Sequence, residues 1–148
     1  MLAEILNRSD TIEECYEFLL AYAAQGLPSD QGSKSGAQVR DFLQNAVKAL
    51  TRLAETFATA VKEEGLEPAD KYLAFVAVLD RDARDSLAAI QLVLAQPIIS
   101  SQLIDNLNAS IHLRALLTDL FLAGEILRKQ DKPAGQVVAS EGVGPPSN

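Results

Sequence analysis

The sequence predicts an all-α fold: an antiparallel four-helix bundle with a short first helix, three long helices and a disordered C-terminal tail. Hydrophobic residues make up 48% of the 148 residues, yet aromatic residues make up only 5% and tryptophan is absent. This composition favours helix over sheet. Apolar residues also recur at spacings of three and four along most of the chain, and the linkers between these segments are mostly short. We expect one domain over residues 1–130 and a tail over 131–148.

The first predicted helix covers residues 11–25. Thr11 and Glu14 have the spacing of a capping box, with Thr11 as the N-cap residue and Glu14 at the third helical position. Gly26 is suited to the position just after the helix. Upstream, residues 2–6 are expected to form a short apolar turn that packs on the body of the domain.

The second predicted helix runs from near Ser35 to about Glu64 and is stopped by Gly65. It follows a loop, residues 26–36, that is rich in Gly and Ser and is expected to be flexible. Its apolar residues keep one phase throughout, which predicts a single helix about 43 Å long at about 1.5 Å per residue.

The third predicted helix has Pro68 in its first turn and ends at about Gln96, before Pro97. Its charged stretch, residues 80–85, does not interrupt the apolar face. Opposite charges four residues apart stabilise that stretch as helix.

The fourth predicted helix begins at Ser100 or Ser101 and ends near Arg128 or Lys129, where basic residues favour a helix end. The sequence after it is rich in Gly, Pro and Ser, which predicts disorder over residues 131–148.

Two apolar stripes run along the stretch Ala109–Leu127, whereas the other helices have one apolar face each. The first stripe has the heptad spacing of a coiled-coil seam, so we expect it to form a homodimer interface. Its residues are Ala109, Leu113, Leu116, Leu120, Ala123 and Leu127. The second stripe consists of Ile111, Ala115, Leu122 and Ile126, extended upstream by Ile104. The alternative is a monomer that buries both stripes, in which a charge at Leu116 or Leu120 unfolds the protein instead of dispersing a dimer.

His112, the single histidine, lies on a narrow polar strip between the two stripes, together with Asp119. Histidine phosphotransfer domains are four-helix bundles with one exposed histidine, followed by a segment of small and basic residues. Arg114 and Ala115 supply both residue types, although their order matches poorly. The other interpretation is a partly exposed histidine that is hydrogen-bonded to a neighbour on its own helix.

Metal and thiol chemistry find little support in the sequence. A di-iron bundle needs Glu-x-x-His motifs, and Ala109 stands three residues before the only histidine. One cysteine and one histidine are too few for a structural zinc site. Cys15 lies on the apolar face of its helix and is expected to be a small core residue. We therefore expect no cofactor, no metal and no catalytic residue.

The net charge of −7 argues against nucleic acid and anionic membranes as partners. The single cysteine allows no internal disulfide, which fits a reducing compartment, and we expect a cytoplasmic protein. Together these observations favour a non-enzymatic interaction module, an adaptor or chaperone-like bundle that forms a homodimer and binds an unidentified protein. A signalling domain that uses His112 and a carrier of a small ligand are the alternatives.

Overall fold

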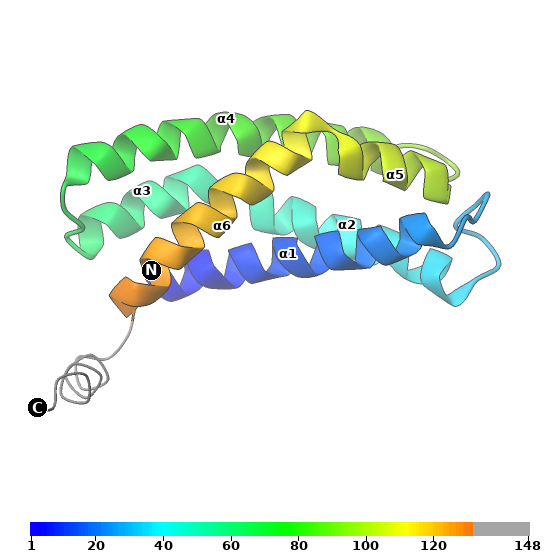
Figure 1. Ribbon diagram of the computed structural model, residues 1–148, viewed down its shortest axis with the longest axis horizontal. Coiled ribbons are helices and arrows are strands. Elements are labelled where there is room, and N and C mark those ends of the chain that lie inside the picture. Colours follow the sequence, from blue (N-terminus) through cyan, green and yellow to red (C-terminus); the bar gives the residue numbers. More distant parts are fainter. Residues whose placement is uncertain (132–148) are drawn as a thin grey trace, which may run out of the picture.

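The computed structural model describes residues 1–131, and all regular secondary structure in that range is helical (Figure 1). The six helices are α1 (Leu2–Ala24), α2 (Lys34–Leu50), α3 (Leu53–Glu63), α4 (Ala69–Leu94), α5 (Ser101–Ala109) and α6 (Ile111–Asp131). The prediction of an all-α fold is confirmed. The expected count of four helices is wrong, because the second and the fourth each divide in two. The predicted disordered tail lies outside the described residues, except for Asp131, which ends α6.

Helix α1 begins at Leu2, so the expected helix start at Thr11 is wrong and residues 2–6 belong to the helix. The Thr11 hydroxyl donates to the carbonyl of Asn7 at 3.1 Å and caps nothing. The apolar repeat extends upstream through Ser9, which is buried and donates to Glu13 Oε2 at 3.2 Å. Because Ser9 interrupts the apolar pattern, the sequence does not show that residues 2–10 belong to the same helix as residues 11–24. Its buried residues are Leu2, Ile5, Ser9, Ile12, Cys15, Leu19 and Tyr22.

The break between α2 and α3 lies at Thr51 and Arg52 and replaces the single long helix expected over residues 35–64. Arg52 has a left-handed backbone, with φ of 60°, which residues other than glycine adopt at a cost. The break frees backbone carbonyls, and Arg8 of α1 donates to two of them, those of Thr51 at 2.7 Å and Ala49 at 3.3 Å. A contact between helices therefore stabilises a break that the apolar pattern does not show.

The second break, at Ser110, separates α5 from α6. The Ser110 hydroxyl accepts from the Leu113 amide at 3.3 Å, so it caps the new helix. After this point the chain turns, and α6 runs diagonally toward the end of the molecule where α1 begins (Figure 1). An ion pair of 2.9 Å joins Arg128 to Asp10 of α1 at that end.

At the opposite end, the loop that the sequence predicts to be flexible is held by hydrogen bonds. Asp30 binds the Arg40 guanidinium at 2.9 Å and accepts from the Ile99 amide at 2.9 Å. Arg40 also donates to the backbone carbonyls of Leu94 and Gln96. Burial by itself would raise the pKa of Asp30, but these donors outweigh it and hold the pKa below its ordinary value. The loop is therefore joined firmly to the connection between α4 and α5.

The core lies along the inside of the six helices and contains Tyr22, Leu43, Phe57 and Leu116 among its most buried side chains. The Tyr22 hydroxyl donates to the Ile99 carbonyl at 2.7 Å, so its polar atom is satisfied within the core. Within residues 1–131 no helix has the length and apolar character needed to cross a membrane.

Candidate interaction surface

The stripe that was expected to form a dimer interface lies in the chain's own core. Leu113, Leu116 and Leu120 are at most 3% exposed, Ala123 and Leu127 are also buried, and only Ala109 is exposed. An interface requires these side chains at the surface of the folded chain. The prediction that this stripe forms the dimer interface is therefore wrong. The turn at Ser110 decides which side of α6 faces inward, and heptad spacing alone does not.

The second stripe of α6 is the exposed one. Ile111 is 75% exposed and Leu122 53%, and Phe121 beside them is 55% exposed. Single exposed apolar residues are common, but several on one helix mark a candidate interaction surface. We call this surface the outer ridge. It consists of Ile111, Arg114, Ala115, Thr118, Phe121, Leu122, Glu125 and Ile126.

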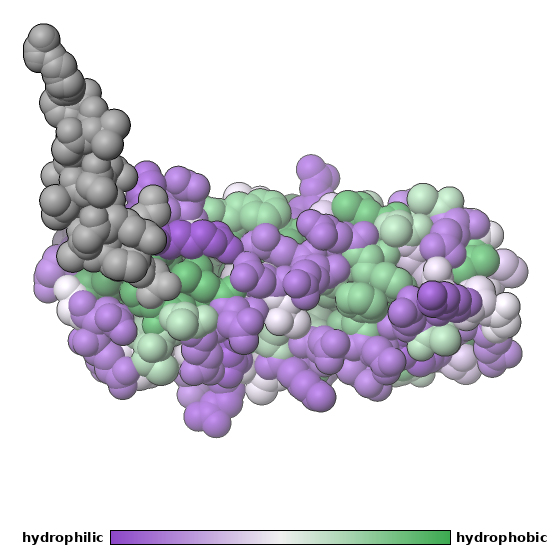
Figure 2. Space-filling view, turned by 90° about the horizontal axis from the view of Figure 1, so that it is seen from below, coloured by the Kyte–Doolittle hydropathy of each residue, from purple (hydrophilic) through white to green (hydrophobic). Residues whose placement is uncertain are grey.

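On the face seen from below, hydrophilic side chains lie between separate hydrophobic patches (Figure 2). Helix α1 contributes an acidic outer face, on which Asp10, Glu14 and Glu17 are exposed. The ridge therefore differs chemically from the acidic α1 surface of the same molecule.

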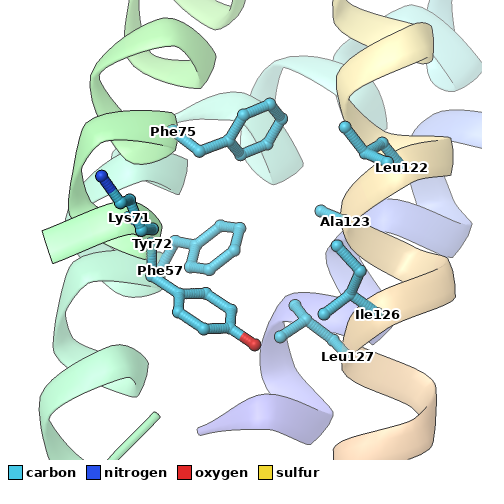
Figure 3. Close-up of a pocket in the computed structure, with 8 residues that line it drawn as sticks. All are labelled: Phe57, Lys71, Tyr72, Phe75, Leu122, Ala123, Ile126 and Leu127. Carbon is cyan, nitrogen blue, oxygen red and sulfur yellow. The ribbon is translucent and has the colours of Figure 1, made fainter. Parts of the chain in front are cut away.

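An apolar groove of about 330 Å³ lies beside the ridge, between α4 and α6 and above α3. Aromatic side chains of α3 and α4 face aliphatic side chains of α6 across it, and the Tyr72 hydroxyl points into the space between them (Figure 3). Among residues 1–131, Lys71 is the one charged residue of its lining. The lining consists of Phe57, Lys71, Tyr72, Phe75, Leu122, Ala123, Ile126 and Leu127. Leu122 and Ile126 belong to both the groove and the ridge, so the two features form one continuous apolar surface.

His112 is exposed near the start of α6, and its Nδ1 lies 3.9 Å from a carboxylate oxygen of Asp85 on α4. The sequence predicts a polar partner for His112 on its own helix. The carboxylate beside it instead belongs to another helix, α4. Its backbone carbonyl accepts from the Ser86 hydroxyl at 2.9 Å, which ties the start of α6 to α4. Arg114, the other basic residue of this region, is exposed on the ridge.

Asp119 is buried, 8% exposed, and faces Asp82 of α4 instead of lying on an open polar strip with His112. Burial, followed by a hydrogen bond and charge repulsion with Asp82, raises the pKa of Asp119 to about 7. Its Oδ2 atom has no hydrogen-bond partner within residues 1–131. The buried carboxyl is therefore poised to lose its proton near neutral pH.

Cys15 is buried in α1, and burial raises the pKa of its thiol to about 12. Because only the thiolate reacts quickly, we expect labelling of Cys15 by an alkylating reagent at pH 8 to be slowed by at least about a hundredfold relative to the unfolded chain. Following the reaction by mass spectrometry, with and without urea, measures this ratio. Equal rates in the two states contradict the buried placement.

The sequence places Phe57, Tyr72 and Phe75 on apolar faces, but it does not show that these residues border a groove. Tyr72 and Phe75 are half-buried where α6 turns away from α4 (Figure 1). Helical periodicity predicts which face of a helix is apolar, but it does not predict where two helices diverge. Within residues 1–131 no group of three or more His, Cys, Asp or Glu side chains is arranged to hold a metal ion. Comparisons with protein-family models, with curated proteins and with solved structures found no match to this chain.

Proposed function

We propose that this protein is a non-enzymatic interaction module that self-associates through the outer ridge of α6. The observation that supports it is the group of four large apolar side chains exposed on one helix. They are Ile111, Phe121, Leu122 and Ile126, which are between 40% and 75% exposed.

The energetic argument is one of burial. Burying a fully exposed side chain of this size is worth about 1.5–3 kcal/mol. The four side chains of the ridge are 40–75% exposed, so each contributes roughly half of that value or somewhat more when a partner covers it. Most of the other large apolar side chains of α6 are already in the core. The ridge is therefore the part of this helix on which further burial is available.

The experiment measures the mass of the full chain by light scattering from low to high micromolar concentration. We expect a species heavier than the 15.9 kDa of one chain, and we expect Leu122→Asp to return it to that mass while leaving the helical circular dichroism unchanged. The matched control is Leu92→Asp, at a 66% exposed leucine of α4 outside the ridge. Only the 15.9 kDa species at every concentration would overturn self-association.

Carriage of a small apolar ligand is the second candidate, and the groove of about 330 Å³ favours it. This volume is at the lower end of the range of small-molecule sites. An apolar fluorescent probe that binds a chain shown to be monomeric, and that Phe75→Ala displaces, would support the carrier instead of the interaction module.

A further inference from the structure

The outer ridge has two unlike halves, and this asymmetry predicts how two copies pack. Its first half contains a shallow hollow of about 420 Å³ lined by Ala109, Ile111, Arg114, Ala115 and Thr118. Its second half projects three large apolar side chains, those of Phe121, Leu122 and Ile126, whereas the first half projects one, that of Ile111 at the edge of the hollow. A ridge that has a hollow at one end and projecting side chains at the other is complementary to a reversed copy of itself.

The charges on the ridge follow the same arrangement. Arg114 lines the hollow. Glu125 lies among the projecting side chains, eleven positions later along the helix, with its carboxylate 3.7 Å from the exposed Lys129 ammonium. Residues eleven apart are separated by three helical turns, so both side chains lie on the same side of the ridge. In a parallel pair of helices Arg114 would face Arg114. In an antiparallel pair Arg114 of each copy faces Glu125 of the other.

We propose that the partner of the outer ridge is a second copy of this chain, packed with its α6 antiparallel to the first about a two-fold axis near Asp119–Leu120. This inference rests on the proposed self-association and adds its geometry. The axis lies midway between Arg114 and Glu125, so the two copies form two equivalent ion pairs. It also places Phe121 and Leu122 of each copy over the hollow half of the other.

A two-fold arrangement also limits the size of the assembly. The same patch is used by both copies, so assembly stops at the dimer. Each substitution on the ridge then acts twice in one complex.

The test is a charge exchange in the full chain, with the dissociation constant measured by sedimentation. We expect Arg114→Glu and Glu125→Arg each to weaken the dimer by about tenfold, because two like-charged contacts replace two ion pairs. The variant that carries both changes should regain an affinity within about threefold of the original, since the ion pairs are re-formed in reverse. The matched control is Arg81→Glu, at an exposed residue of α4 outside the ridge, which should leave the constant unchanged.

A distance measurement gives a second readout that does not depend on charge. In a Cys15→Ser background, spin labels are attached to a cysteine introduced at Thr118 or at Lys129. Antiparallel packing predicts that the labels in the two copies are close at position 118 and about 30 Å apart at position 129. Parallel packing predicts similar short separations at both positions.

The outcomes separate the two proposals. A dimer in which the single charge reversals have no effect, or in which both label positions give short distances, overturns the antiparallel arrangement and leaves self-association standing. Growth beyond the dimer also overturns it, because a two-fold interface closes. A chain that stays monomeric at all concentrations overturns both.

Discussion

Leu116→Asp is expected to abolish cooperative folding of this protein. The Leu116 side chain is fully buried, so the substitution removes core packing worth about 2–5 kcal/mol and buries an unpaired carboxylate at a further cost of several kcal/mol. That sum approaches the total stability of a typical domain, about 5–15 kcal/mol. Circular dichroism and gel filtration should show an unfolded or aggregated chain. A folded monomer would contradict the burial of Leu116 and would support the interface that the heptad spacing predicts.

A milder variant keeps this prediction measurable if the charged one cannot be purified. Leu116→Ala should remain folded and lose about 2–5 kcal/mol of unfolding free energy in urea. The contrasting variant is Leu122→Ala, since Leu122 is 53% exposed, and its loss should be well under about 1 kcal/mol. Equal losses at the two positions would contradict the inward placement of the first stripe.

The stability of the protein is expected to fall by about 2–3 kcal/mol between pH 5 and pH 8 because of Asp119. The pKa of Asp119 is raised to about 7 in the folded state, against its ordinary value of 3.8 in the unfolded chain. The folded state therefore holds a proton that the unfolded state releases, and it gains stability from this at low pH. This stabilisation of the folded state declines as the pH rises from about 4 to 7. Above pH 7 Asp119 is charged in both states, and the burial of its charge lowers the stability by a constant amount.

Asp119→Asn tests this dependence, because an amide at this position cannot ionise and can donate to the Asp82 carboxylate. Urea unfolding at pH 5 and pH 8 should show that the variant has lost most of the decline and is more stable than the unchanged chain at pH 8. The matched control is Asp85→Asn, at an exposed carboxylate on the same face of α4, which should keep the decline. If Asp119→Asn declines with pH as steeply as the original chain, the raised pKa is not the cause.

The sequence determined the helical class of the fold and several of the helix ends. The 3-and-4 spacing predicted helix for most of residues 11–129, and the glycines that follow α1 and α3, Gly26 and Gly65, both have the left-handed backbone that ends a helix. Pro68 and Ser100 stand at the starts of α4 and α5 as expected. At these positions the residue type itself favours a helix end, through the backbone of Gly and Pro and through the capping hydroxyl of Ser100, which accepts from the Leu103 amide.

Tertiary structure decided the two breaks and, through them, the candidate surface. Arg52 adopts a left-handed backbone that its residue type does not favour, and Arg8 of another helix satisfies the carbonyls freed beside it. The turn at Ser110 then directs one stripe of α6 into the core and leaves the other exposed. The two stripes are similarly apolar, so periodicity could identify both but could not rank them. Which stripe lies inside depends on where the other helices lie, because burial is a property of the packed chain.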